Sequence, residues 1–173
     1  MKKYALLFSF LLFYTLEARE ITDMAGRKIS APGTVERSFA SAPPMGLLSY
    51  ILAPETMTAM NLPLDSNFYF KNTKHLDKSL AKLPVVGGWH GNTRGANMET
   101  LLALKPQIIL AWKSDFVMKE VEKSFAKFNI PVFFIQEDLV EDEPNAIRAA
   151  GRALGREARA EILAKDAEAR LSY

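Results

Sequence analysis

Cysteine is absent from this chain of 173 residues, and its absence excludes three kinds of chemistry. A chain without cysteine forms no disulfide, offers no thiolate to a metal ion and has no N-terminal cysteine for a lipid anchor. Histidine is scarce as well, with His75 and His90 the two present. A metal site built by the protein alone needs three or four ligands, so His90 is predicted at most to supplement a metal already held by a chelator.

An excess of either charge is also missing, because 22 basic residues face 20 acidic ones and the two kinds are interspersed. Without a basic patch, nucleic acid is not expected as a partner. Catalytic motifs are lacking too. The glycines between Gly87 and Gly95 match neither a dinucleotide-binding nor a phosphate-binding loop, and there is no G-x-S-x-G elbow. The sequence therefore predicts a protein that is not an enzyme, with an exported α/β enzyme or a one-lobe scaffold as alternatives.

The one long apolar run lies at the start, where Lys2 and Lys3 precede apolar residues 4–14. This run is about half the length of the roughly 20 residues that a membrane-spanning helix needs. A positive start followed by a short apolar segment predicts a signal peptide over 1–18, cleaved before Arg19. The mature protein is then expected in the periplasm as a freely diffusing, near-neutral chain.

Apolar runs bounded by glycine and proline alternate along the rest of the chain with segments of helical periodicity. A small hairpin is expected over 20–30. Strands are predicted at 35–41, 57–61, 83–86, 107–112 and 131–136, and helices at 46–52, 98–105, 116–128, 141–154 and 157–173. Strands separated by helices predict an α/β fold with a central parallel sheet between two helical layers.

Ligands of open parallel sheets bind beyond the carboxyl ends of the strands. This rule points to three predicted loops, which are 41–45, 87–97 and 112–114. The candidate ligand-binding residues on them are Pro44, Met45, Trp89, His90, Arg94 and Lys113.

Two of these loops combine cationic and aromatic side chains. Arg94 offers a planar fork of donors to carboxylate or catecholate oxygens, and Lys113 adds a second positive charge. Trp89 offers a large face for stacking, and His90 a supplementary metal ligand. The alternatives are local packing for Trp89, a solvated loop charge for Arg94 and an exposed loop position for His90.

Longer motifs carry a resemblance to a known family. They are LPVVGGW at 83–89, NMETLLALKPQIIL at 97–110, NIPV at 129–132 and AGRALGRE at 150–157. Together they resemble the periplasmic binding proteins for ferric siderophores, haem and cobalamin. The similarity extends over essentially all of 21–173.

That resemblance implies two lobes joined by one long helix, with the ligand between them. Residues 19–155 would form the first lobe and 156–173 the start of the joining helix, and the second lobe is expected to lie outside this sequence. The last helix has no glycine, asparagine or proline to end it, which also predicts a truncated chain.

The same resemblance implies the partners. These are the permease and ATPase subunits of an ABC importer, with Glu99 docking the lobe on the permease, and the chain is expected to be a monomer without a covalent cofactor. The implied ligand is first a ferric (Fe3+) siderophore, second a nickel (Ni2+) or cobalt chelate, and third cobalamin or haem.

Overall fold

A computed structural model describes residues 18–64, 76–90 and 93–172, except the side chains of Lys78, Thr93 and Arg94. The predicted signal peptide lies outside the described residues apart from Ala18. Within the described ranges, no helix combines the length and the apolar character needed to cross a membrane.

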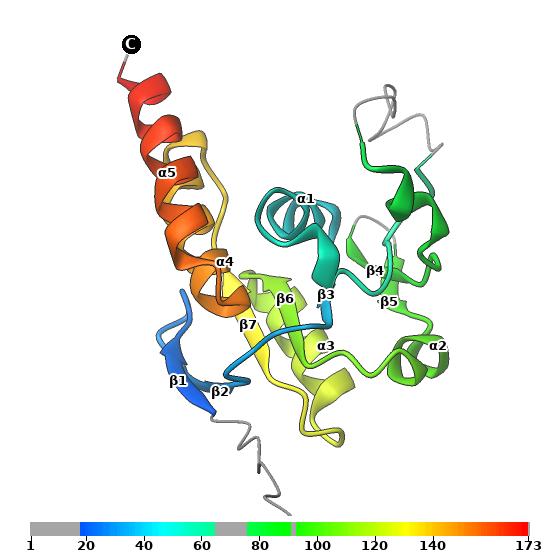
Figure 1. The fold of residues 1–173 in the computed structure, drawn as a ribbon. Coiled ribbons are helices and arrows are strands. Elements are labelled where there is room, and N and C mark those ends of the chain that lie inside the picture. The colour runs from blue at the N-terminus through cyan, green and yellow to red at the C-terminus, as the bar shows by residue number, and fades with distance from the viewer. Residues whose placement is uncertain (1–17, 65–75, 91–92, 173) are drawn as a thin grey trace, which may run out of the picture.

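A parallel sheet forms the centre of the fold, as predicted. Its strands are β3 (Ser38–Ala40), β6 (Ile108–Trp112) and β7 (Val132–Ile135), in the order β3-β6-β7 (Figure 1). The predicted strand at 57–61 does not form. Its residues make single β-bridges instead, one of which pairs Met57 with Ser38 of β3. The apolar runs identified the strands because each strand is buried on both faces.

One face of the sheet is covered by three helices, α1 (Pro43–Leu52), α4 (Glu143–Leu154) and α5 (Glu157–Leu171). Alternate strand residues point to this layer, among them Ile108 and Leu110 of β6, both fully buried. We call this the α4 face of the sheet.

The other face receives the intervening strand residues, such as Ile109 and Ala111. It is covered by α3 (Asp115–Phe125), by α2 (Met98–Ala103) and by the segment from Val86 to Trp89. We call this the α3 face. The chain is therefore a three-layer lobe, which confirms the predicted fold class.

Two antiparallel hairpins complete the fold. The predicted one joins β1 (Arg19–Thr22) to β2 (Lys28–Ala31). The second joins β4 (Gly87–His90) to β5 (Thr93–Ala96), where the sequence predicted a strand at 83–86 that stops before Gly87 and Gly88, and then a loop over 87–97. That prediction was wrong because both glycines are part of the hairpin ladder, in which Gly88 pairs with Gly95. Single 3-10 turns lie at Pro54–Thr56, Lys78–Lys82 and Val140–Asp142.

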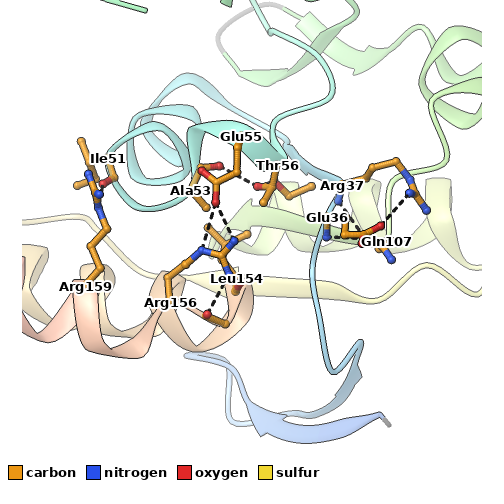
Figure 2. Close-up of polar contacts among 12 residues, drawn as sticks. Glu36, Arg37, Ile51, Ala53, Glu55, Thr56, Gln107, Leu154, Arg156 and Arg159 are labelled. Carbon is orange, nitrogen blue, oxygen red and sulfur yellow. Dashed lines mark hydrogen bonds and ion pairs between the residues drawn. The ribbon is translucent and has the colours of Figure 1, made fainter. Parts of the chain in front are cut away.

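The start of α5 is tied to the helical layer by arginines (Figure 2). Arg156 binds the Glu55 carboxylate, with 2.7 Å between Nη2 and Oε1, and Arg159 donates to the Ile51 carbonyl at 2.7 Å. Further along, Arg148 of α4 pairs with the carboxylates of Glu161 and Glu168. Polar contacts at both ends therefore fix the direction in which α5 leaves the sheet.

Candidate functional site

The three central strands end side by side, and the segments that follow them form what we call the carboxyl edge. Backbone hydrogen bonds between neighbouring strands continue past the last strand residues. Ser41 N donates to the Leu110 carbonyl at 2.8 Å, and Lys113 N donates to the Ile135 carbonyl at 2.7 Å. Ser41, Lys113 and the residue after Ile135, Gln136, are thus held in register. Two of the three predicted loops, 41–45 and 112–114, lie at this edge as expected.

The loop after β3 is shorter than predicted, because α1 already begins at Pro43. Proline is well tolerated in the first helical turn, where its missing N–H has no partner to lose. Pro44 is exposed at the edge, as a ligand contact requires. Met45 is fully buried on the core-facing stripe of α1, so the prediction that it contacts a ligand was wrong.

The pair of prolines also limits what the start of α1 can bind. A helix N-terminus binds small oxyanions through free backbone N–H groups. Pro43 and Pro44 have none, and Gly46 N already donates to the Ala42 carbonyl at 3.0 Å. This end of the edge therefore favours apolar contact with a larger ligand over capture of a small oxyanion.

The β4–β5 hairpin is fastened to the end of β3. Trp89 N donates to the Ser41 carbonyl at 2.8 Å, and the buried Asn61 amide donates to the carbonyls of Ala40 and Gly87 at 2.8 and 3.0 Å. Position 88 requires glycine, because a Cβ there would collide with the Ser41 carbonyl oxygen. The hairpin is thus a fixed extension of the edge.

Trp89 points inward from this hairpin. Its side chain is 2% exposed and packs on Phe125 of α3, with the ring centroids 5.8 Å apart. The local-packing alternative is therefore correct, and the predicted stacking face for a ligand was wrong. Strand alternation explains the outcome: once β4 is a strand, Trp89 and His90 must point to opposite sides.

His90 and Arg94 occupy the far end of the same hairpin, where His90 pairs with Thr93 and Trp89 with Arg94. His90 is half-buried, and desolvation lowers the pKa of its imidazole, which keeps the ring neutral at physiological pH. The side chain of Arg94 is outside the described part of the chain, so its ligand role stays a prediction. No cluster of three potential metal ligands occurs among the described residues.

Lys113 lies half-buried at the middle of the carboxyl edge. Its ammonium donates to the amide oxygen of Gln136, with 2.8 Å between Nζ and Oε1. Asp138, two residues after Gln136, accepts from the indole Nε1 of Trp112 at 3.2 Å. The sequence analysis identified Lys113 but missed Gln136.

Glu137 is a half-buried carboxyl at the end of β7, and one of its oxygens is buried without a hydrogen-bond partner. Desolvation raises its pKa to about 7, with smaller contributions from the negative charges of Glu143 and Asp142. The carboxyl is therefore largely protonated in mildly acidic solution and ionised in alkaline solution.

Replacing Glu137 by glutamine is expected to stabilise the protein at pH 8 but hardly at pH 5. Because the folded-state pKa lies above the unfolded-state value, wild-type stability falls as the pH rises from about 4.5 to about 7. Glutamine removes this loss, which we expect to be about 1–2 kcal/mol after allowance for contact with water. Urea unfolding at both pH values measures it. An equal gain from Glu141→Gln, an exposed neighbour, would attribute the effect to net charge instead.

Glu99 lies in the first turn of α2, just after the β4–β5 hairpin, and its side chain is exposed. Asn97 caps this helix by accepting from Thr100 N at 3.1 Å. The exposed position is compatible with a docking contact, which stays a prediction.

Comparison with known proteins identifies relatives of the same kind by structure and by sequence. An ABC transporter solute binding protein from Sulfurospirillum deleyianum matches with a TM-score of 0.77 and 31% identity, over 86% of this chain and 46% of that one. A periplasmic solute binding protein from Veillonella parvula matches with a TM-score of 0.74 and 22% identity, over 91% of this chain and 47% of that one.

In sequence, the vitamin B12-binding protein of Pectobacterium carotovorum is 36% identical over 67 residues, which are 39% of this chain and 22% of that protein. No protein-family model matches the chain. The chain spans less than half the length of the two solved proteins, and the aligned part spans less than a quarter of the curated relative. The resemblance seen in the sequence is confirmed, and the chain has the fold of one lobe of the periplasmic solute-binding proteins of ABC transporters.

Proposed function

We propose that this chain forms the first lobe of a periplasmic binding protein that captures a metal chelate and delivers it to an ABC importer. The observation that carries the proposal is the likeness to the Sulfurospirillum solute binding protein, at 31% identity across 86% of this chain. The relatives found are binding proteins, which supports a binding role over the alternative of an exported enzyme.

The carboxyl edge supports a chelate as the ligand. It offers an exposed proline, a half-buried neutral imidazole and a half-buried ammonium, from Pro44, His90 and Lys113. Together these groups suit a large ligand with both apolar and anionic parts, and they do not form a metal site by themselves. The metal is expected to arrive already bound by its chelator, with His90 as a supplementary ligand and Arg94 as a further cation.

Two ligand classes follow from different observations. The double glycine at 87–88, Trp89 and the Met-Ala-Gly-Arg turn at 24–27 resemble those of siderophore binders, which favours a ferric chelate, with a nickel chelate second. The 67-residue similarity to a vitamin B12-binding protein supports the other ligand class, a corrinoid. The two classes differ in charge, because a ferric tris-catecholate is strongly anionic and cyanocobalamin has no net charge.

The remaining parts of the proposal concern position and partners. The α5 segment is proposed to begin the helix that joins the two lobes, and residues 1–18 are proposed to direct export. Glu99 is proposed to contact the permease, since it is exposed on a helix beside the hairpin rather than at the carboxyl edge.

Ligand titration of the 15N-labelled chain tests the proposal. The probes are the gallium(III) tris-complex of 2,3-dihydroxybenzoate, a diamagnetic analogue of a ferric catecholate, and cyanocobalamin. Binding to one lobe should be weak, so we expect saturable shifts of the Lys113, Ser114 and Gln136 amides with a dissociation constant on the order of 1 mM. If neither probe causes saturable shifts, or if the shifts map to α5 and the opposite edge, the chain does not bind such ligands at this site.

A further inference from the structure

Lys113 is a half-buried cation whose hydrogen-bond partner is a neutral amide. Its ammonium has three donors, and the contact found for it is the single bond to the Gln136 amide oxygen. None of the ion pairs in the described part of the chain includes Lys113. The positive charge of this half-buried ammonium is therefore not compensated by an ion pair with any described carboxylate.

Glu137, the acidic residue next to Gln136, does not pair with Lys113, because the two lie on different faces of the sheet. The alternation of β7 places Phe134 on the α3 face and Ile135 on the α4 face, so Gln136 continues on the α3 face and Glu137 on the α4 face. In agreement, the charges that act on Glu137 come from the start of α4. Lys113 follows Ala111 on the α3 face, which is the side of the β4–β5 hairpin.

Gln136 itself is held from its other side. Its backbone N–H donates to the Met24 thioether at 3.4 Å, and Met24 N donates to the Phe134 carbonyl at 3.0 Å. The buried Asp23 carboxylate accepts from Phe134 N at 3.3 Å. The turn between β1 and β2 therefore secures the outer edge of β7 just before Gln136, and fixes the backbone from which its amide reaches Lys113.

We propose that Gln136 is a positioning residue, whose amide oxygen fixes the Lys113 ammonium at the carboxyl edge without neutralising it, so that the ammonium binds an anionic oxygen of the ligand. This inference rests on the proposed function and selects between its ligand classes: the site prefers a chelate with carboxylate or catecholate oxygens over an uncharged corrinoid. A glutamate at position 136 would satisfy the same geometry but would neutralise the charge.

The test measures both probes by NMR titration of the chain and its variants. Gln136→Met keeps the size of the side chain and removes the acceptor, and it should raise the dissociation constant of the gallium catecholate about threefold. Gln136→Glu and Lys113→Gln should each raise it about tenfold, since each removes a charge-assisted contact. Cyanocobalamin binding should change less than twofold in all three variants, as should catecholate binding in the control Lys127→Gln, an exposed lysine at the opposite edge.

A double variant separates positioning from direct contact. If Gln136 acts through Lys113, adding Gln136→Met to Lys113→Gln should have no further effect on catecholate affinity. A further loss would overturn the inference, as would a single Gln136→Met or Gln136→Glu variant that binds the catecholate like wild type. Binding of both probes without any effect of these variants rejects the inference alone, whereas binding of neither probe rejects the proposed function.

Discussion

The Gly88→Ala variant is expected to lose about 3 kcal/mol of unfolding free energy, although alanine is a conservative replacement in most strands. The new Cβ would collide with the Ser41 carbonyl oxygen and lie 2.6 Å from the Asn61 amide nitrogen. Both atoms are fixed, since the Ser41 carbonyl accepts from Trp89 N and the Asn61 amide donates to two carbonyls. Relief therefore requires breaking hydrogen bonds or moving backbone, and both are costly.

The cross-strand partner of Gly88 provides the control. A Cβ at Gly95 would lie 3.9 Å from the Trp89 indole nitrogen, which is an ordinary contact, so Gly95→Ala should change stability by less than about 0.5 kcal/mol. Urea unfolding of both variants, followed by Trp fluorescence, makes the comparison. Equal stabilities would show that the hairpin is not packed against the end of β3. The Gly88→Ala variant should also weaken ligand binding, because the collision displaces the hairpin that positions His90.

Elements whose apolar residues follow one clear spacing were predictable from the sequence. The run at 107–112 identified β6, and the spacing of Val117, Val121 and Phe125 identified α3, because a buried strand and an amphipathic helix each leave a clear apolar pattern. The helix predicted at 116–128 begins one residue earlier, at Asp115, because Ser114 caps it by accepting from Val117 N at 3.3 Å. Helix ends depend on local geometry that periodicity does not specify.

The β4–β5 hairpin and the first turn of α1 could not be predicted as easily. Gly87 and Gly88 indicate a break in a strand, yet here Gly88 allows close approach to Ser41, a residue far away in sequence. Likewise, the two prolines after Ala42 suggest a loop, and their role as a helical first turn follows from the packing of Met45 against the core. Trp89 and Met45 were misassigned for these reasons.

The candidate site was predictable in its location but not in its detail. The rule that ligands bind beyond the carboxyl ends of parallel strands placed Lys113 correctly. Applied also to the predicted strand at 131–136, the same rule would have indicated Gln136, which follows β7. The pairing of Lys113 with Gln136 rather than Asp138 depends on the register between β6 and β7, which the sequence alone does not specify.

The Gly151→Ala variant is expected to be about 2 kcal/mol less stable than wild type, despite the higher helix propensity of alanine. Gly151 lies in α4, and a Cβ there would collide with the Cβ of Ala160 in α5 and lie 3.4 Å from the Arg156 carbonyl oxygen. Alanine stabilises a helix by about 0.5–1 kcal/mol relative to glycine. The cost of overpacking must therefore exceed this stabilisation for the variant to lose stability.

Gly46→Ala is the matched control, because Gly46 is also helical but has room: its Cβ would lie 3.7 Å from the Asn61 side-chain oxygen. This variant should gain about 0.5–1 kcal/mol in the same urea unfolding experiment. A gain from both glycines would mean that α4 and α5 are not in close contact at Gly151. If only Gly151→Ala loses stability, faster amide hydrogen exchange along α5 should accompany the loss, because the collision moves α5 away from α4. The helix proposed to join the two lobes would then depend on glycine at position 151, as well as on its arginine contacts, for its packing against α4.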